Sequence, residues 1–572
     1  MTTTTAPPPA GSAAAAWFDQ HQPLLDRALA TIRTREYWSA YPESPSPKNY
    51  GENAQAQGKT ALEARLGTRF ELAQPGTVGW IGAERSPFGV AIGVTYPQID
   101  QDALLAAVTR AQRDWAAATP KYRAGVAMEM LARINKASFE IAFATMYTTG
   151  QAFMMAFQAA GPHAQDRGLE ALAYAYDAMS DVPSFALWEK PQKNEPLRVE
   201  KRYRIVPRGI GLVIASSTFP TWNSYPAMFA DLVTGNAVVV KPHPNSILPL
   251  AITVEIMRGV LAEAGFDPNV VALAADTPES PIAKQLATRP EVGLVDYTGS
   301  SSFGTWLEQN AKQAQVFTEK AGVNAVVIDS TDDLPGLAKN LAMSLSLYSG
   351  QMCTTPQNVF VPRAGIKTAD GDASFDDVLG AISKAVEGLL SAPERAVEIL
   401  GAIATDATLE RVKAESAKPG VVLASKTLAH PQFPGARVHT PLIARLDASD
   451  EERYGGEMFG PIAFVIATDS TEQSLELAAR GARSCGAITA VLYSADPAVI
   501  VRAEDFAADA GVSLAVNLTG ALLVNQSAAF SDFHVTGANP AGNASLTDAA
   551  FVANRFRITQ TRTVVPGTAS AG

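Results

Sequence analysis

Short apolar runs alternate with segments of helical periodicity between residues 209 and 328. The runs are rich in β-branched residues and have the length of buried strands: GLVIA at 211–215, AVVVKP at 237–242, VVALA at 270–274, GLVDY at 293–297 and AVVI at 325–328. This alternation predicts βαβ units, and hence a parallel sheet with helices on both faces. Ligands of such sheets bind beyond the carboxyl ends of the strands, so we expect the chemistry at that edge.

The pattern differs on either side of this region. Residues 100–179 are helical almost throughout, with alanine-rich amphipathic stretches that are typical of a scaffold. After residue 328 the alternating style returns, which predicts a second α/β domain. Its strand candidates lie at 359–362, 461–467 and 487–493.

The N-terminal part follows neither pattern. Residues 1–16, MTTTTAPPPAGSAAAA, contain no basic segment and no long apolar segment, so they predict a disordered tail rather than a signal peptide. Residues 17–74 combine helical periodicity with a breaker-rich patch at 41–47. They predict an N-terminal extension wrapped on the body of the protein.

Composition narrows the class of protein. A chain of 572 residues exceeds a single core and predicts more than one domain. The net charge of -11 repels polyanions, and the basic stretch at 198–204 alternates with apolar residues as a strand does, so no nucleic-acid partner is expected. Two cysteines are too few for a disulfide framework and indicate a reducing, cytoplasmic location. The sequence contains no run of about eighteen apolar residues, so no membrane span is expected.

Cys353 is the first candidate for chemistry, in GQMCTTP at 350–356. Small neighbours would let a substrate approach the sulfur, although a free cysteine is more often a small buried hydrophobe. A nucleophilic thiol usually has a histidine partner, and the six histidines (21, 163, 243, 430, 439 and 534) fit no cysteine-hydrolase arrangement. Glu319, which precedes a glycine and a strand, is the alternative base, acting through water. We expect no metal site.

Three further segments are candidates for nucleotide binding. Lys241 ends a strand, where its cation could reach a ribose hydroxyl or a phosphate; a surface lysine is the alternative. Gly299 and Ser300 lie between a strand and a probable helix start, where amides could meet a pyrophosphate, although the GxGxxG spacing is absent. Glu457 and Phe459 lie in a glycine-rich turn that could hold a ribose and a flat ring, with an ordinary turn as the alternative.

The order of these motifs is more specific than any one of them. Over about residues 75–565 the series resembles the aldehyde dehydrogenase superfamily: TFP at 218–220, GNAVVVKP at 235–242, YTGS at 297–300, EKAG at 319–322, GQMC at 350–353 and EMFGP at 457–461. Within that superfamily the chain is similar to the PaaN group of phenylacetic acid degradation proteins. That similarity rests on the N-terminal extension and on the SSTFPTWN and KPHP forms of two motifs.

The resemblance implies an α/β fold of the aldehyde dehydrogenase type, with two Rossmann-like α/β domains and a small bridging and oligomerisation element. We expect a cofactor-binding domain over 75–320, which includes a bridging strand at about 195–206, and a catalytic domain over 321–510. Residues 511–572 would return to the cofactor-binding domain and end in an oligomerisation strand.

The resemblance also implies roles. Cys353 would attack the aldehyde carbon, and the adduct would pass a hydride to the nicotinamide and become a thioester. Glu319 would activate water for deacylation. The backbone amide of Cys353 would stabilise the oxyanion, a contribution of about 2.7–4 kcal/mol in comparable sites. The cofactor residues implied, from adenosine to nicotinamide, are Lys241, Gly299, Ser300, Glu457 and Phe459.

Two departures from the family pattern concern the catalytic side. The asparagine that usually donates to the oxyanion is Thr218 here, so either the Thr218 hydroxyl or the nearby Asn223 would serve. Lys320 and Ala321 stand in the motif that carries the catalytic acid, which predicts a differently shaped approach to Glu319.

A third departure concerns the cofactor. The family acid that accepts the ribose 2′-hydroxyl of NAD is replaced by Pro244, which follows His243 at the adenosine end of the site. Loss of a negative charge there relieves repulsion of a 2′-phosphate, so the sequence favours NADP over NAD.

These features predict oxidation of an aldehyde to a free acid, with a ring-derived semialdehyde from aromatic catabolism, free or as a CoA thioester, as the implied substrate. A CoA-acylating enzyme is the second hypothesis, which the presence of Glu319 disfavours, and a catalytically silent binding protein is the third. Residues 195–206 and 555–565 alternate apolar and polar residues as exposed strands do. They predict a homodimer or a dimer of dimers.

Overall fold

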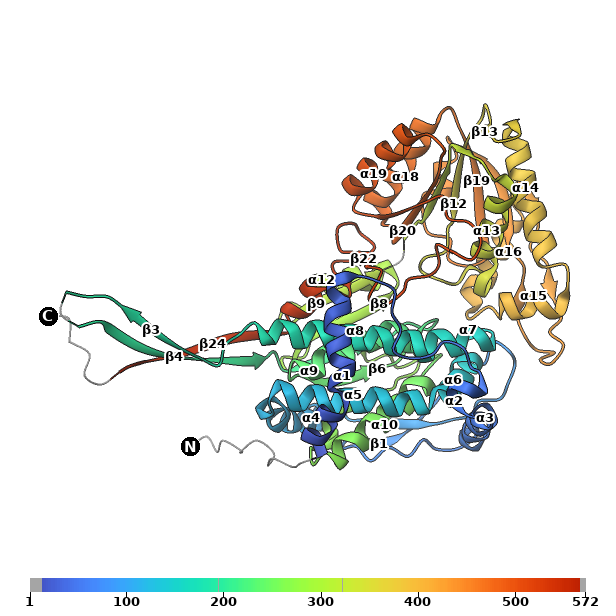
Figure 1. The fold of residues 1–572 in the computed structure, drawn as a ribbon. Helices are drawn as coiled ribbons and strands as arrows, with labels where there is room; N and C mark the ends of the chain where they lie inside the picture. Colours follow the sequence, from blue (N-terminus) through green and yellow to red (C-terminus); the bar gives the residue numbers. More distant parts are fainter. Residues whose placement is uncertain (1–12, 194, 321, 566–572) are drawn as a thin grey trace.

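The computed structural model describes residues 13–193, 195–320 and 322–565. The chain forms two lobes that face each other, and a long β arm projects from the first lobe (Figure 1). Within the described residues, no helix is both long enough and apolar enough to cross a membrane.

A five-stranded parallel sheet forms the centre of the first lobe. Its spatial order is β7 (Val271–Leu273), β6 (Ala237–Lys241), β5 (Ile210–Ile214), β8 (Val292–Gly299) and β9 (Gln315–Lys320). Four of the predicted runs form strands here, while the run at 325–328 forms β10 of the second lobe. The strand order reverses at β5: the chain runs from β5 through β6 to β7 and then crosses to β8 on the other side of β5. A ligand crevice is therefore expected at the carboxyl end of β5.

Helices cover this sheet. The predicted helical region is confirmed as α4 (Gln101–Ala117), α5 (Pro120–Lys136), α6 (Ser138–Thr149), α7 (Phe153–Gln158) and α8 (Ala164–Ser180). The helices that follow strands of the sheet are α9 (Pro220–Val233), α10 (Leu248–Glu263), α11 (Ala283–Ala287) and α12 (Ser301–Asn310).

The N-terminal extension packs on these helices. It contains α1 (Ala13–Thr34), α2 (Pro47–Tyr50) and α3 (Ala54–Arg65), and α1 crosses α5 closely: a Cβ on Gly125 would lie 2.7 Å from the carbonyl oxygen of Ala14. The predicted tail boundary at residue 16 is therefore wrong, because residues 13–16 form the first turn of α1. Alanine has the highest helix propensity, and this turn is held by burial of Ala14. The rest of the predicted tail lies outside the described residues.

The second lobe contains a seven-stranded sheet in which only β15 runs antiparallel. Its spatial order is β15 (Val421–Leu423), β18 (Leu442–Asp447), β19 (Ile462–Thr468), β12 (Asn358–Pro362), β10 (Ala325–Ile328), β20 (Thr489–Tyr493) and β21 (Ser513–Val516). The three predicted strands are confirmed as β12, β19 and β20. The predicted domain boundary at 510 is wrong, because β21 pairs in parallel with β20 and extends this sheet.

Helices flank the second sheet, and the remaining short strands form two-stranded sheets and one three-stranded sheet, β11-β13-β14. The helices are α13 (Leu334–Ser346), α14 (Phe375–Leu389), α15 (Pro393–Leu400), α16 (Asp406–Ser416), α17 (Glu451–Tyr454), α18 (Thr471–Cys485) and α19 (Pro497–Ala510). The short strands are β1 (Thr77–Ile81), β2 (Tyr96–Ile99), β11 (Ser330–Thr331), β13 (Ile366–Thr368), β14 (Gly371–Ala373), β16 (Thr427–Leu428), β17 (Val438–His439), β22 (His534–Thr536) and β23 (Ser545–Leu546).

After β21 the chain returns to the first lobe and ends in the arm (Figure 1). The arm is an antiparallel sheet of β3 (Phe185–Lys190), β4 (Leu197–Pro207) and β24 (Phe556–Val564), of which β3 was not predicted. Arg555, after the short helix α20 (Ala549–Ala553), anchors it: the fully buried guanidinium lies 2.7 Å from Asp231 and 2.6 Å from Asp296. This buried charge cluster fixes the arm to α9 and β8.

Candidate active site

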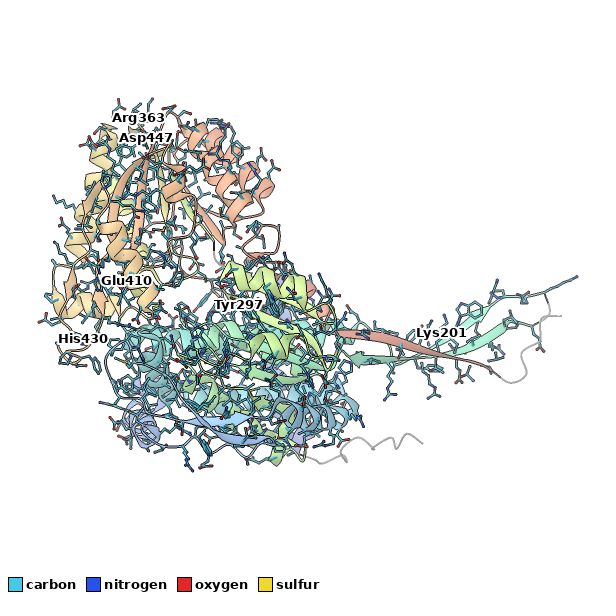
Figure 2. The ribbon with its side chains drawn as sticks, turned by 180° about the vertical axis from the view of Figure 1, so that it is seen from behind. Lys201, Tyr297, Arg363, Glu410, His430 and Asp447 are labelled. Atoms are coloured by element: carbon cyan, nitrogen blue, oxygen red, sulfur yellow. The ribbon has the colours of Figure 1, made fainter. Side chains whose placement is uncertain are left out.

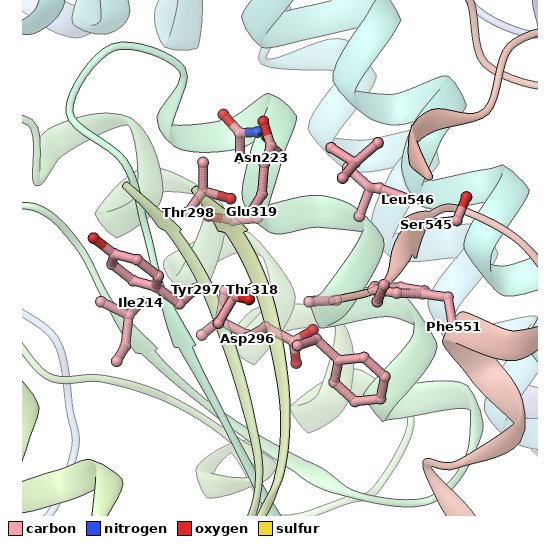
Figure 3. Close-up of a pocket in the computed structure, with 16 residues that line it drawn as sticks. Ile214, Asn223, Asp296, Tyr297, Thr298, Thr318, Glu319, Ser545, Leu546 and Phe551 are labelled. Carbon is pink, nitrogen blue, oxygen red and sulfur yellow. Dashed lines mark hydrogen bonds between the residues drawn. The ribbon is translucent and has the colours of Figure 1, made fainter. Parts of the chain in front are cut away.

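Four side chains from distant parts of the sequence meet at the carboxyl edge of the first sheet. Glu319 lies near the end of β9, Asn223 lies in the first turn of α9, Cys353 precedes β12, and His534 begins β22. The ligand atoms of Glu319, Cys353 and His534 all lie within 4.8 Å of one another. Asn223 and Glu319 share the upper end of a small cavity of about 30 Å³ (Figure 3). The structure therefore brings together the predicted nucleophile, the predicted base and one predicted oxyanion donor.

The backbone before Cys353 is strained, and this fixes the position of the thiol. Tyr348 and Ser349 have positive φ angles of 52° and 50°, and Gly350 follows at 64°. A Cβ on Gly350 would lie 2.4 Å from the carbonyl oxygen of Gly460, so only glycine fits. Strain of about 1–3 kcal/mol for each such residue persists only where the surroundings enforce it. Here the Tyr348 hydroxyl donates to the Thr149 carbonyl at 2.5 Å.

Glu319 is held as a carboxylate by its neighbours. The Asn223 amide donates to Glu319 Oε2 at 3.0 Å, and Nε2 of His534 lies 3.1 Å from Glu319 Oε1. Burial opposes ionisation, but His534, Cys353 and Asn223 outweigh it and hold the pKa of Glu319 below its ordinary value. A carboxylate with these contacts can accept a proton from a thiol or a water molecule.

Cys353 rests as a thiol. Burial, and then the adjacent Glu319 charge, raise the pKa of the Cys353 thiol well above its ordinary value. The sulfur lies 3.6 Å from His534 Nε2. Cys353 therefore needs a local proton acceptor and a local hydrogen-bond donor before it can attack, and the cluster contains both.

His534 is the functional residue that the sequence did not reveal. It is separated from Cys353 by 181 residues and belongs to no motif, so no spacing linked the two. Its ring is 2% exposed and meets the Trp222 ring edge-on, with centroids 4.8 Å apart. The expectation that Cys353 has no histidine partner is thus wrong, because His534 Nε2 lies 3.6 Å from its sulfur.

The two oxyanion candidates differ in their contacts. Asn223 reaches the cluster, where its Oδ1 accepts from the Ser216 hydroxyl at 3.2 Å while its amide group donates to Glu319. The backbone carbonyl of Thr218 accepts from the Gln151 amide at 2.7 Å, whereas the Thr218 hydroxyl has no hydrogen bond to any described residue. Lys320 turns away from the cluster, with its ammonium 2.9 Å from Glu308, and Ala321 lies outside the described residues.

The predicted cofactor residues of the first lobe lie along the same sheet edge. Lys241 ends β6, and Gly299 ends β8, where Ser300 occupies the N-cap position of the ten-residue helix α12. Nζ of Lys241 lies 2.7 Å from Oδ1 of Asp276, a buried carboxylate in the loop after β7 that the sequence did not single out. Burial, and then Lys241, lower the pKa of His243 to about 4, so this imidazole is neutral at neutral pH.

The second lobe supplies Glu457 and Phe459 from the segment between α17 and β19. Both line a cavity of about 20 Å³ together with Cys353 and Met352, which belong to the same lobe. The first lobe reaches the sulfur through Glu319, whose carboxylate lies within 4.8 Å of it. Burial raises the pKa of Glu457 to about 7, opposed by Arg411 and by the Gly322 backbone amide.

These groups fit a nicotinamide dinucleotide laid along the crevice. The N-terminus of α12 would suit phosphate oxygens, and the Lys241 ammonium, already paired with Asp276, would suit ribose hydroxyls. A carboxylate at Glu457 suits ribose hydroxyls, and the flat ring of Phe459 lies beside Cys353 in one cavity. When bound, such a cofactor supplies the hydride acceptor.

The comparisons with known proteins agree with this geometry. Residues 85–520 match the model of the aldehyde dehydrogenase family. The chain belongs to this family.

Several proteins of known description are similar to this chain. The N-succinylglutamate 5-semialdehyde dehydrogenase of Burkholderia lata is 26% identical over 430 residues, covering 73% of this chain and 80% of that protein. The benzaldehyde dehydrogenase [NAD(+)] of Pseudomonas putida is 25% identical over 391 residues, covering 66% and 73%. A crystal structure described as an NAD-dependent aldehyde dehydrogenase from Burkholderia multivorans is 60% identical, with a TM-score of 0.95 over 96% of this chain and 99% of that chain.

Proposed function

We propose that the protein oxidises an aldehyde to a carboxylic acid with a nicotinamide dinucleotide, through a thioester on Cys353. The observation that carries this proposal is the meeting of the Cys353, Glu319, His534 and Asn223 cluster with Glu457 and Phe459 of the other lobe.

The residues divide the chemistry in two halves. Glu319 takes the thiol proton, and the sulfur of Cys353 attacks the carbonyl carbon, while the backbone amide of Cys353 and the side-chain amide of Asn223 are placed to donate to the oxyanion. Once the hydride has passed to the nicotinamide, a thioester remains, and Glu319 releases the thiol proton to solvent. Glu319 can then take a proton from water as the water oxygen attacks the acyl carbon; collapse of this adduct releases the acid and expels the Cys353 thiolate, which regains a proton from Glu319. Thr218 stays a prediction as an oxyanion donor.

Water rather than CoA is the proposed acyl acceptor, because Glu319 is present, ionised and beside the sulfur. The test is formation of the reduced cofactor from aldehyde with and without CoA. Turnover without CoA is expected, and strict CoA dependence would overturn the proposal. If Cys353→Ala keeps aldehyde-dependent reduction of the cofactor, the nucleophile is misassigned; if the wild-type protein gives none with any aldehyde, a silent binding protein is supported.

As substrate we propose a semialdehyde from the degradation of aromatic acids, free or as a CoA thioester. The support is the similarity of the SSTFPTWN and KPHP motifs and the N-terminal extension to the PaaN group. A spectrophotometric screen that covers aromatic aldehydes, short semialdehydes and CoA-linked semialdehydes tests this. A kcat/KM that is highest for an unrelated aliphatic aldehyde would contradict it.

The choice between NAD and NADP also depends on Asp276, a negative charge beside Lys241 that the sequence-based argument for NADP did not include. Asp276 already neutralises Lys241 at 2.7 Å, and His243 is neutral, so a 2′-phosphate of about two negative charges would meet no free cation at these residues. We therefore propose NAD as the preferred cofactor, and the NADP prediction stays untested.

Binding measurements separate the two cofactors without turnover. Protein fluorescence titrations should show tighter binding of NAD+ than of NADP+, and Asp276→Asn should improve NADP+ binding about tenfold by removing one charge near Lys241. Glu279→Gln, which changes an exposed acid on the same loop, is the control and should change neither affinity. A wild-type preference for NADP+ would restore the original prediction.

We propose that the arm pairs subunits into a homodimer or a dimer of dimers, in the cytoplasm, where two free cysteines stay reduced. Lys201 lies on the arm well away from Tyr297 at the first sheet, and the arm continues beyond it (Figure 2). Large apolar side chains are exposed along it, with Leu187 at 50% and Ile558 at 53%. Light scattering at micromolar concentration should give a dimer or larger, and a monomer would contradict the proposal.

A further inference from the structure

His534 lies where one hydrogen can serve two anions. Its Nε2 is 3.1 Å from Glu319 Oε1 and 3.6 Å from the Cys353 sulfur, distances that suit a hydrogen bond to oxygen and a longer one to sulfur. The imidazole needs no rotation to reach either atom.

The surroundings of the ring decide which nitrogen carries the hydrogen. Nδ1 of His534 is buried and has no hydrogen-bond partner among the described residues. A hydrogen there would be a buried donor without an acceptor, at a cost of about 1–3 kcal/mol. Nε2, by contrast, faces the carboxylate oxygen of Glu319 and must donate to it. The geometry therefore places a hydrogen on Nε2, between Glu319 and Cys353.

We propose that His534 is a hydrogen-bond donor whose Nε2–H stabilises the Glu319 carboxylate at rest and the Cys353 thiolate during attack. When the S–H bond of Cys353 breaks and its proton bonds to Glu319, the negative charge moves from oxygen to sulfur. The Nε2–H of His534 lies within reach of both and follows the charge, while His534 keeps its own proton. The inference rests on the proposed role of Cys353 as nucleophile.

The scaffold around His534 holds the ring in this position. Trp222 packs against it edge-on, and the guanidinium of Arg167 lies over the Trp222 ring at 5.4 Å. The same Arg167 donates to the Asp532 carbonyl at 3.0 Å and to the Ser527 hydroxyl at 2.7 Å, which fixes the segment that leads into His534.

The N-terminal extension completes this scaffold. The guanidinium of Arg35 lies 3.9 Å from the ring centroid of Phe533, and Trp38 packs on Phe530 with centroids 4.9 Å apart. Arg35 also pairs with Glu170, which pairs with Arg167. The extension thus clamps the segment 527–533 from outside, and a donor held by such packing needs little reorganisation when charge develops.

Two variants separate a donor from a proton acceptor. His534→Gln keeps an amide N–H that can donate but cannot take up a proton, and His534→Phe keeps a ring with neither property. Rates of alkylation of Cys353 by iodoacetamide are measured against pH by mass spectrometry of the full chain, without cofactor. Cys485, an exposed thiol outside the cluster, is the internal reference in every sample.

The donor role predicts that His534→Phe slows alkylation of Cys353 about tenfold to a hundredfold at neutral pH and moves its midpoint to higher pH. His534→Gln should stay within about threefold of the wild type, because its amide replaces the donor. If Gln is as slow as Phe, the imidazole acts as a base and the proposal is wrong. If Phe matches the wild type, His534 does not act on the sulfur at all.

Two controls keep these outcomes interpretable. Alkylation of Cys485 and the thermal unfolding transition should be unchanged in both variants, which excludes a folding defect. Cys353→Ser tests the proposed function separately: if it retains aldehyde-dependent cofactor reduction, the nucleophile assignment fails whatever the His534 variants show.

Discussion

Two carboxylates lie near the same sulfur, one from each lobe: Glu319 is buried and Glu457 is partly buried, and their ionisation differs. Glu319 of the first lobe has a lowered pKa, whereas the pKa of Glu457 of the second lobe is raised to about 7. Burial acts against the charge of both. His534 and Asn223 both contact the Glu319 carboxylate and favour its charged form. For Glu457, only the charge of Arg411 and one backbone amide counteract the effect of burial on the pKa. Hydrogen-bond partners, not depth, decide which acid is charged before the reaction.

The difference matches the two proposed tasks. An acid that must accept a proton in each half of the reaction has to be ionised at rest. The side chains of His534 and Asn223 keep Glu319 ionised before any ligand binds. An acid that binds ribose hydroxyls can rely on the ligand to bring the donors, and Glu457 then gains its partners only on binding. The contrast predicts separate pH responses for chemistry and for cofactor binding.

The largest effect is expected from Glu319→Gln, which removes the base and keeps the shape. Turnover should fall by about a hundredfold to ten thousandfold, because deacylation loses the group that takes the water proton. If residual acylation through another acceptor is faster than deacylation, rapid-mixing absorbance will show a burst of reduced cofactor of one equivalent per site. Near wild-type turnover in this variant would remove Glu319 from the mechanism.

A smaller effect is expected from Asn223→Ala, which removes one of the donors that keep Glu319 ionised. The pKa of Glu319 should rise, so the acid limb of the kcat profile should move to higher pH, by about one unit for a single charge-assisted hydrogen bond. Thr221→Val, which changes a buried polar side chain of the same helix turn, is the matched control. An unshifted acid limb with a uniform loss of rate would mean that Asn223 serves the oxyanion alone.

Glu457 should control binding in the same pH range without changing the chemistry. As pH falls through about 7 its carboxylate becomes protonated, so the wild-type affinity for NAD+ should weaken. Glu457→Gln should bind NAD+ about tenfold more weakly near pH 8 and show no such pH dependence. Equilibrium dialysis or fluorescence titration measures both, and a parallel decline in wild type and variant would assign the pH dependence to another group.

The sequence predicted the members of this comparison but not the groups that make them differ. Cys353, Glu319 and Glu457 stand in motifs whose order carries information, and the structure brings them to one crevice. His534 and Asp276 lie in segments of ordinary composition and act only through folding, which joins positions as far as 215 residues apart. Strand β3, the edge strand β21 and the first turn of α1 were missed for a related reason: neighbours in space, rather than local pattern, stabilise short or alanine-rich segments.

The smallest effect is on stability, and its sign distinguishes the two acids. Glu457 has a raised pKa in the folded state, so it contributes stability that is complete below its unfolded pKa and is lost as pH rises through about 7. Glu457→Gln should therefore be more stable than the wild type near pH 8, by about 1–2 kcal/mol, and equal to it near pH 5. Glu319 has the opposite sign: its contribution is present above the unfolded pKa and is lost as pH falls through the lowered folded value, so Glu319→Gln should be less stable near pH 8. Thermal unfolding of both variants at the two pH values measures this, and a stabilised Glu319→Gln would show that the donors around Glu319 do not compensate its burial.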